Sequence, residues 1–452
     1  MHERIDHGAN LLKNHVFQFD FLNDDFTKLP QSLQDIINDE QKRKKLVIYI
    51  NPPYAEHGNR ATFAGLGEHK SSVATTSNVY NQLSKTVGTA TRELFVQFFL
   101  RVHNEIPNCN LASFSTLKYV NSQNFLKFRQ YFKGNYEKGF ICRADTFDNV
   151  KGKFPIGFLI WNLNNKQEIK QVKTDIVNEY SEFIGFKYFY AFGSKSFISS
   201  WLRKFYDKVN EAIGHLILPG VDMQQQNGVY ITSKPTDSDI AQHKTATITK
   251  NNLIVMTIYL AIRQVIEPSW LNNRDQFLHP NDNWLTDIEF QNDCLAYTLF
   301  NNIIQSEFGA NQWIPFTEQE VNAKEKFASN FMTDFMSGKL KVAQAAQNTL
   351  FANETVGGIY HNEARQFSPE AQAVFDAGRA LWQYYHAQQN VNVNASLYDI
   401  REYFQGRNAA GRMNARSDDA KYTALIGELR SKLNVLADKI KPKIYEYGFL
   451  KE

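Results

Sequence analysis

The stretch KKLVIYINPPY, residues 44 to 54, ends an apolar run with a rigid polar corner. The apolar residues before the corner are rich in isoleucine and valine, a composition typical of a buried strand. Pro52 and Pro53 end the strand, because proline fixes φ and lacks the N–H that a β-ladder requires. Asn51 precedes the two prolines and Tyr54 follows them. The stretch therefore predicts an amide and an aromatic ring at the C-terminal end of a strand.

This corner offers groups suited to hold an amino group attached to a flat ring. Proline donates no hydrogen bond, so carbonyl groups near the corner stay available as acceptors. The side-chain carbonyl of Asn51 and the backbone carbonyl of Pro52 would give two acceptors aimed at one point, which match the two hydrogens of a planar –NH2 group. The ring of Tyr54 would offer a face on which a heterocycle stacks.

Around this corner, the first 195 residues alternate strands and helices, as α/β proteins do. We therefore expect a largely parallel, doubly wound, Rossmann-like sheet. Residues 55–92 carry no clear period and read as a long functional loop. Besides the strand at residues 44–50, the predicted elements are strands at Val16–Leu22, Leu111–Leu117 and Phe154–Leu163 and a helix at Glu93–His103.

The rest of the chain reads as a mixed and then a mainly helical region. Residues 196–330 contain short β-like runs such as Gly228–Ser233 among amide-rich segments. From residue 331 the pattern is helical, and Ser368-Pro369-Glu370 supplies an N-cap, a first-turn proline and an early acid. Apolar stripes at helical spacing follow, which we interpret as helix-to-helix core. They comprise Val374, Phe375, Gly378, Leu381, Trp382 and Tyr385, and then Tyr422, Leu425, Leu429, Leu433, Leu436 and Ile440.

Composition limits the class of protein. Apolar residues make up 43% of the 452 residues, and the formal net charge is only +3, so attraction to nucleic acid must come from local patches. Cys109, Cys142 and Cys294 form no CxxC pair, so we expect reduced thiols, no metal site and a cytoplasmic setting. The polar N-terminus and the short apolar run at residues 253–262 predict neither a signal peptide nor a membrane span.

The tetrapeptide Asn-Pro-Pro-Tyr resembles motif IV of the amino-group DNA methyltransferases, most closely the adenine-N6 enzymes of the gamma order. In that family the motif follows the fourth strand of a fold that binds S-adenosyl-L-methionine (AdoMet). The resemblance covers about the first 165 residues and implies that Asn51, Pro52, Pro53 and Tyr54 are catalytic. Asp20 matches the acidic residue at the end of an earlier strand, which in the family binds the adenine amino group of the cofactor.

The resemblance continues downstream of the motif. Residues 112–132 are similar to the strand, loop and helix of the family's next motifs. Residues 145–161 are similar to the segment in which an aromatic residue precedes a final strand hairpin, and in the family that aromatic packs on the flipped target base. Phe147 is the best match for this residue and Phe154 the second. A core phenylalanine is the alternative interpretation of both positions.

The resemblance also implies a mechanism. Asn51 Oδ1 and the Pro52 carbonyl would accept both hydrogens of an adenine amino group and favour a pyramidal nitrogen with a freed lone pair. That nitrogen would attack the methyl group of the AdoMet sulfonium, a reaction that rests on positioning and electrostatics rather than on a strong base. The adenine must leave the duplex to reach the corner, where Tyr54 and Phe147 would stack on it.

Double-stranded DNA is therefore the expected partner. Cations exceed anions between residues 118 and 153, a local excess that suits phosphate contacts, although a solvated face is the alternative. Residues 270–284 mix amides, aromatics and a cation as a base-reading loop does, with an ordinary connection as the alternative. The candidate DNA-binding residues are Lys118, Lys127, Arg129, Arg143 and Arg274.

The sequence shows no glycine-rich turn of the kind by which the resembled family binds AdoMet. The first 50 residues contain one glycine, Gly8, and the glycines at Gly357, Gly358 and Gly448 lack the spacing and the preceding strand of a permuted copy. We therefore expect an incomplete AdoMet site, in a truncated chain or in a split enzyme whose glycine turn lies on a separate polypeptide. A specificity or nuclease subunit is a further possible partner, and we expect no membrane partner.

Three regions and three functional hypotheses follow. Residues 1–195 would form an N-terminally incomplete methyltransferase domain, residues 196–330 a target-recognition region, and residues 331–452 a helical region. The leading hypothesis is a site-specific DNA adenine-N6 methyltransferase of a restriction-modification system. The alternatives are a catalytically inactive DNA- or partner-binding remnant of such an enzyme and a glutamine-N5 methyltransferase, because these enzymes also use Asn-Pro-Pro-Tyr.

Overall fold

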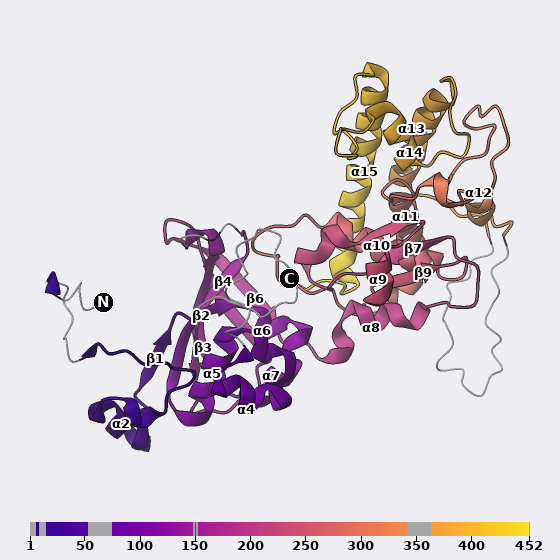
Figure 1. The fold of residues 1–452 in the computed structure, drawn as a ribbon. Helices are drawn as coiled ribbons and strands as arrows, with labels where there is room; N and C mark the ends of the chain where they lie inside the picture. Colours follow the sequence, from indigo (N-terminus) through magenta and orange to yellow (C-terminus); the bar gives the residue numbers. More distant parts are fainter. Residues whose placement is uncertain are drawn as a thin grey trace, which may run out of the picture. The chain divides into compact units, whose positions relative to one another are not determined.

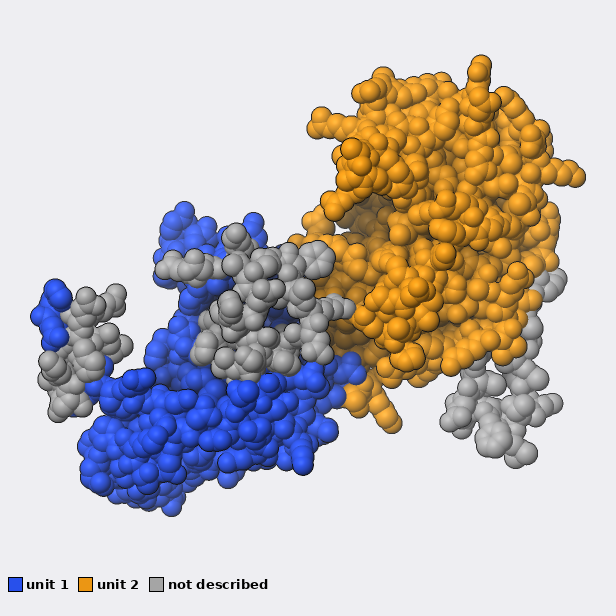
Figure 2. All heavy atoms as spheres, in the orientation of Figure 1, with its two compact units in different colours: residues 1–193, 269–274 blue, residues 194–268, 275–452 orange. Residues whose placement is uncertain are grey.

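The computed structural model describes residues 6–8, 15–52, 75–147, 150, 152–340 and 363–451. The chain divides into two compact units, coloured separately in Figure 2. Unit 1 comprises residues 1–193 and the short segment Ser269–Arg274, and unit 2 comprises residues 194–268 and 275–452. The segment Ser269–Arg274 therefore belongs to unit 1, although its neighbours in sequence on both sides belong to unit 2.

A mixed sheet forms the centre of unit 1 (Figure 1). Its strands are β1 (Val47–Ile50), β2 (Asn110–Thr116), β3 (Asn135–Arg143), β4 (Pro155–Asn162), β5 (Gln171–Val177) and β6 (Phe183–Tyr190). In the described residues their order is β1-β2-β4-β3-β5-β6. β1 pairs with β2, and β3 with β5, in parallel, whereas β4 is antiparallel to both its neighbours and β6 is antiparallel to β5.

The expected α/β class is confirmed, but the expectation of a largely parallel sheet is wrong. β4 follows β3 as a hairpin and enters the sheet between β2 and β3, and β6 returns along β5 in the same way. Hairpin connections force antiparallel pairing, so three of the five neighbouring pairs among the described strands are antiparallel. The predicted strands at residues 44–50, 111–117 and 154–163 correspond to β1, β2 and β4.

Helices pack on one face of this sheet. They are α2 (Gln31–Asn38), α3 (Glu40–Arg43), α4 (Asn78–Val87), α5 (Leu94–Glu105), α6 (Lys118–Asn121) and α7 (Leu126–Tyr131). The predicted helix at Glu93–His103 is α5, whose apolar side chains are buried almost all round. Phe95 and Phe99 of α5 share a buried core with Leu111, Leu159 and Trp161 of the sheet. Burial of this face supplies the main driving force for folding of unit 1.

The other face of the sheet carries a second set of aromatic side chains, which lies outside that core. We call Tyr49, Phe114, Phe140 and Phe158 the aromatic face. Its rings touch one another, with centroids 4.8 Å apart for Phe114 and Phe158 on the neighbouring strands β2 and β4, and 6.0 Å apart for Tyr49 on β1 and Phe158. Tyr49 is 62% exposed and the other three are partly buried. The two faces of the sheet therefore differ in how far they are covered.

Unit 2 is built around the buried helix α10. Twelve of its thirteen residues are buried. β7 lies between β8 and β9 in a three-stranded antiparallel sheet, and the residues expected to form the regions 196–330 and 331–452 share one hydrophobic core. The elements are α8 (Ile198–Leu202), β7 (Gly214–Ile217), β8 (Tyr230–Thr232), α9 (Asp237–Ala241), β9 (Thr245–Ile248), α10 (Leu253–Val265), α11 (Ile288–Leu299), α12 (Phe331–Met336), α13 (Pro369–His386), α14 (Leu397–Gln405) and α15 (Ala420–Glu446).

The long C-terminal helices begin and pack as the sequence predicts. Ser368 caps α13 by accepting a hydrogen bond from the Ala371 N–H. Gly378, in the middle of α13, lets Phe300 approach the helix closely. A Cβ at Gly378 would lie 2.3 Å from Cε1 of Phe300, a buried ring that also packs against Phe375 and Trp382. The glycine is therefore required by packing, although glycine lowers helix propensity.

The Gly378→Ala variant is expected to lower the free energy of unfolding. Overpacking costs about 1–3 kcal/mol, which exceeds the gain of about 1 kcal/mol in helix propensity. The matched control is Gly427→Ala in α15, where a Cβ would meet no atom within 4 Å. This control is expected to raise stability by about 0.5–1 kcal/mol. Urea denaturation followed by tryptophan fluorescence measures both, and equal effects of the two substitutions would contradict the packing role of Gly378.

Candidate functional site

The carboxyl end of β1 carries the first two residues of the predicted corner. Asn51 follows β1 directly and is exposed, and Pro52 is buried. Because β1 and β2 pair in parallel, with Ile50 opposite Ser113, their carboxyl ends lie at the same edge of the sheet. In open α/β sheets ligands bind at this edge. Pro53 and Tyr54 lie outside the described residues.

Phe147 lies at the same end of the sheet as Asn51. It follows the short 3-10 turn Ala144–Thr146 after β3, which runs in the same direction as β1. The Phe147 ring is partly buried and packs edge-on against Phe114 of the aromatic face, with centroids 5.5 Å apart. Phe114 in turn packs against Tyr49, two residues before Asn51, at 6.5 Å. The structure thus links Phe147 to the strand that carries the corner.

Phe154 has a different environment, because a guanidinium group covers it. The Arg274 guanidinium carbon lies 5.1 Å from the centroid of the Phe154 ring, and Arg274 is 7% exposed. The Arg274 carbonyl accepts a hydrogen bond of 2.8 Å from Asn121 Nδ2. Arg274, a predicted DNA-binding residue, is therefore buried within unit 1, and this placement offers a phosphate little surface.

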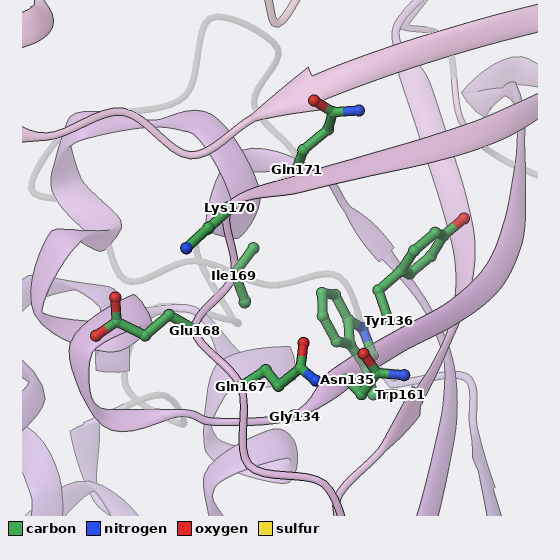
Figure 3. Close-up of a pocket in the computed structure, with 9 residues that line it drawn as sticks. All are labelled: Gly134, Asn135, Tyr136, Trp161, Gln167, Glu168, Ile169, Lys170 and Gln171. Atoms are coloured by element: carbon green, nitrogen blue, oxygen red, sulfur yellow. The ribbon is translucent and has the colours of Figure 1, made fainter.

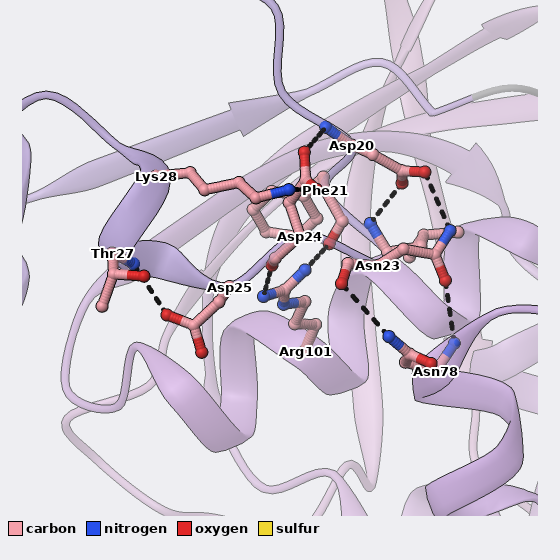
Figure 4. Close-up of polar contacts among 10 residues, drawn as sticks. Asp20, Phe21, Asn23, Asp24, Asp25, Thr27, Lys28, Asn78 and Arg101 are labelled. Atoms are coloured by element: carbon pink, nitrogen blue, oxygen red, sulfur yellow. Dashed lines mark hydrogen bonds and ion pairs between the residues drawn. The ribbon is translucent and has the colours of Figure 1, made fainter.

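Asp20 lies in a turn rather than at the end of a strand (Figure 4). The predicted strand Val16–Leu22 is wrong, since these residues form extended chain and a turn without ladder pairing in the described part. The Asp20 carboxylate accepts hydrogen bonds from the Leu22 N–H at 3.0 Å and from Asn23 Nδ2 at 2.8 Å. Asn23 Oδ1 in turn accepts a hydrogen bond from the Asn78 N–H at 3.0 Å. A cofactor contact by Asp20 stays a prediction.

Arg101 fixes this turn, a role that local sequence patterns do not predict. Its guanidinium group donates hydrogen bonds to the carbonyls of Phe21 and Asp24, and its carbon lies 4.4 Å from the centroid of the Phe26 ring. Phe19, Phe21 and Phe26 therefore surround the Arg101 cation, and Phe19 and Phe21 do not belong to a strand. The one available signal was a single arginine inside the apolar run of α5.

The four remaining DNA-binding candidates have unequal access to solvent. Lys118 pairs with Glu93 at 2.8 Å, and Arg143 forms a two-point ion pair with Asp145 at 2.8 and 2.7 Å. Hydrogen bonds from Arg143 lower the pKa of Asp145 below its usual value. Lys127 is exposed. These three side chains retain contact with solvent, which a phosphate contact requires.

Arg129 instead supports the fold. It is 6% exposed, and its guanidinium group donates to the carbonyls of Tyr119 at 3.2 Å, Ser122 at 2.8 Å and Phe192 at 2.9 Å. Burial lowers the pKa of Arg129 to about 10, so the group stays charged at neutral pH. A side chain held in this way has little surface to offer a phosphate, and the structure gives Arg129 a structural role in place of the predicted one.

The described residues do not make up a site for AdoMet. β1 has a single neighbouring strand, β2, and no glycine turn lies beside Asn51 among the described residues. The carboxylate of Asp20, the one predicted cofactor contact, already accepts two hydrogen bonds in its own turn.

A separate cavity of about 520 Å³ lies at the amino ends of β3 and β5, opposite the edge that carries Asn51 (Figure 3). Tyr136, Trp161, Glu168 and Lys170 line it, together with other residues. Across the described ranges, no group of three or more His, Cys, Asp and Glu side chains is placed to hold a metal ion. None of the helices that the structure describes has both the length and the apolarity needed to cross a bilayer.

No family model matches the chain, and no curated protein matches it. Among solved structures, the chain is similar to an ATP-dependent Type ISP restriction-modification enzyme, LlaBIII, bound to DNA. The sequence identity is 12%, the TM-score is 0.24, and the match covers 46% of this chain and 16% of that chain. The function of this chain is therefore inferred from its own residues.

The Arg129→Ala variant is expected to lower the stability of unit 1 by about 3 kcal/mol, because three buried or partly buried carbonyls lose a charged donor. The matched control is Lys127→Ala, two residues away on an exposed position, which is expected to change stability by less than about 0.5 kcal/mol. Thermal unfolding followed by circular dichroism measures both. A stable Arg129→Ala chain with a reduced salt dependence of DNA binding would contradict the structural role of Arg129.

Proposed function

We propose that this chain is a subunit of a site-specific DNA adenine-N6 methyltransferase of a restriction-modification system. Unit 1 holds the target base, and unit 2 contributes to DNA recognition. The observation that carries the proposal is the position of Asn51-Pro52 at the carboxyl end of β1, beside the parallel strand β2. The order of elements also supports it, since the motif strand, a strand with helices after it, and a hairpin preceded by an aromatic residue follow one another as in the resembled family.

Asn51 and Pro52 hold the amino group of the base. Asn51 is exposed at the edge of the sheet, and the buried Pro52 keeps the backbone of the corner rigid. Two hydrogen-bond acceptors that are fixed before the base arrives do not have to reorganise during the reaction. Such preorganisation is the main source of electrostatic catalysis. AdoMet would supply the methyl group, and Asp20 stays the one described residue that is predicted to contact it.

The target adenine reaches the corner only after it leaves the duplex. Phe147 is the described residue that stacks on it, since its ring lies at the same end of the sheet as Asn51. Its edge-on contact with Phe114 holds the ring in one orientation, which lowers the entropy lost when the base binds. Tyr54 completes this stacking in the proposal.

Phosphate contacts come from the cations that solvent can reach. Lys127 is exposed, and Lys118 and Arg143 keep 24% and 35% of their side chains exposed. Their ion pairs with carboxylates lower the net gain from a phosphate contact, so Lys127 is the strongest of the three candidates. Arg129 and Arg274 support the proposed phosphate-binding surface indirectly. Arg129 fixes backbone carbonyls near it, and Arg274 fixes the Phe154 ring.

A second function is a DNA- or partner-binding subunit without catalytic activity. The observation that favours it is the sheet edge itself, because the described residues place no cofactor site beside Asn51. The two functions differ in the role of Asn51. In the first, Asn51 binds the reacting amino group; in the second, it only helps to shape the corner.

The Asn51→Ala variant is expected to reduce adenine methylation by about 10²–10³-fold, because one of two fixed hydrogen-bond partners of the reacting group is lost. The measurement is the N6-methyladenine content of genomic DNA in cells that carry the variant at the natural locus. The matched control is Asn124→Ala, an exposed asparagine elsewhere in unit 1, which is expected to leave methylation unchanged. DNA binding by purified Asn51→Ala chain is expected to remain close to wild type.

Methylation by the Asn51→Ala variant at the wild-type rate would contradict the proposed role of the corner. Absence of N6-methyladenine in cells with the wild-type chain would favour the inactive binding subunit instead.

A further inference from the structure

Helix α8 of unit 2 continues into the 3-10 turn Arg203–Phe205, and the two together have one apolar and one polar side (Figure 1). Four apolar side chains at helical spacing are buried in the core of unit 2, namely Ile198, Trp201, Leu202 and Phe205. The positions between them, 199, 200, 203 and 204, therefore face outward. They carry two serines, an arginine and a lysine, so the outer side is polar and basic.

Two further lysines flank this outer side. We call Lys195, Arg203, Lys204 and Lys208 the basic surface, and all four residues are exposed. Residues 194–210 contain four cations against one carboxylate, that of Asp207, whereas the whole chain has 50 cations against 47 anions. The near-neutral chain thus has a local excess of positive charge in unit 2, which is the feature that attracts a polyanion.

Asp207 is turned to a structural task and leaves the cations of the basic surface unpaired. It is 7% exposed, and its Oδ1 accepts a hydrogen bond from the Val209 N–H at 2.9 Å. Its Oδ2 accepts from Asn210 Nδ2 and from Thr249 Oγ1, each at 2.8 Å. These bonds fix the turn after Tyr206 and use the acceptor capacity of the carboxylate.

The cations of the basic surface differ in this respect from the candidates in unit 1. Across the ranges that the structure describes, none of the four forms an ion pair with a carboxylate. Lys118 and Arg143 of unit 1, by contrast, are paired with Glu93 and Asp145. A phosphate that meets an unpaired cation displaces no carboxylate, so its net gain in binding free energy is larger.

His279 holds one of these cations in place. Lys204 Nζ lies 2.9 Å from His279 Nε2, and the ring nitrogen is the acceptor because an ammonium group can only donate. The His279 N–H donates to the Ser196 carbonyl at 2.8 Å, which ties the histidine to the start of the same segment. A side chain that is already held loses less conformational entropy when a phosphate binds.

The composition of the surface indicates which polyanion fits it. The outward positions carry no aromatic side chain, and Tyr206 beside them packs against the core of unit 2, so the bases of a single strand find no ring to stack on. Val209 is 93% exposed, but one apolar side chain is too little for a membrane surface, which requires a whole apolar face. Lysine, arginine and serine are the residue types that contact the phosphates of duplex DNA.

We propose that the basic surface binds the phosphate backbone of double-stranded DNA without regard to base sequence. The choice of DNA as the polyanion rests on the proposed function. Phosphate contacts supply affinity and orientation but carry no sequence information. The basic surface therefore holds unit 2 on any duplex, and the reading of bases falls to other residues of the chain.

The test measures the salt dependence of DNA binding by the full-length chain. Fluorescence anisotropy gives the association constant for a labelled duplex at several KCl concentrations. The double variant Arg203→Gln/Lys204→Gln removes two charges and keeps two long polar side chains. The slope of the logarithm of this constant against the logarithm of salt concentration is expected to fall by about 1.8, because each phosphate contact contributes about 0.9. An unchanged slope would overturn the proposal.

The matched control is Lys324→Gln/Lys326→Gln, which removes two exposed lysines from the loop before α12 in the same unit. Its slope is expected to equal that of the wild type. Equal losses in both double variants would overturn the proposal, because net charge alone would then explain the binding. Lys195→Gln/Lys208→Gln is the second test variant and leaves the contact between Lys204 and His279 intact. It is expected to lower the slope by a similar amount, and an unchanged slope would contradict the basic surface even if the first variant failed to fold.

A second duplex of unrelated sequence and an anionic membrane complete the experiment. Both test variants are expected to weaken binding equally on the two duplexes, and a loss confined to one sequence would contradict a backbone contact. Vesicles of equal parts phosphatidylcholine and phosphatidylserine are expected to bind the chain more weakly than DNA does. Tighter binding to these vesicles, lost in the same variants, would overturn DNA as the partner.

The results also separate this surface from the proposed function. Unchanged DNA binding by the test variants, together with adenine methylation that depends on Asn51, would overturn the basic surface and leave the proposed function standing. A reduced slope in the test variants, together with methylation that survives Asn51→Ala, would overturn the proposed function and leave the basic surface standing.

Discussion

The parallel pairing of β1 with β2 is the constraint on which unit 1 depends. Four residue pairs, from Val47 opposite Asn110 to Ile50 opposite Ser113, set the register. Parallel strands need a long crossover, and the chain supplies it with α4 and α5, which then cover one face. A slip of one residue would turn Ile48 and Ile50 away from the core. The same register sets the height of Asn51 relative to Phe114, so the packing of the core and the geometry of the corner are fixed together.

Buried arginines are a second organising feature of unit 1. Arg101, Arg129 and Arg274 are each at most 7% exposed, and each lies over an aromatic ring, donates to backbone carbonyls, or does both. A planar guanidinium group with several donors suits such positions, because one side chain can satisfy several carbonyls. In the cation-rich stretch of residues 118–153, Arg129 therefore serves the interior, whereas Lys127 lies at the surface.

These features mark the limit of what the sequence can predict. β1, β2, β4, α5 and the start of α13 follow from local patterns, since apolar runs, helical spacing and a capping serine are properties of neighbouring residues.

The hairpin of β5 and β6 was missed, although Val172, Thr174 and Ile176 alternate with exposed residues as in a half-covered strand. The roles of Arg129 and Lys118 were out of reach, because their partners Phe192 and Glu93 lie 63 and 25 residues away. Asn51 stands out in the sequence because its neighbours are chemically unusual, and its role stays a prediction. The pairing of the strand before it depends on the whole sheet.

The segment Ser269–Arg274 has a consequence for the modularity of the chain. Because it belongs to unit 1 while the residues before and after it belong to unit 2, the polypeptide crosses between the units three times. Trp270 and Leu271 pack against the unit 1 core, and Arg274 covers Phe154. Recombination at a single junction would therefore transfer unit 2 together with a piece of its neighbour's core. Exchange of unit 2 between related chains, in evolution or by engineering, requires either co-inheritance of both units or breakpoints on each side of this segment.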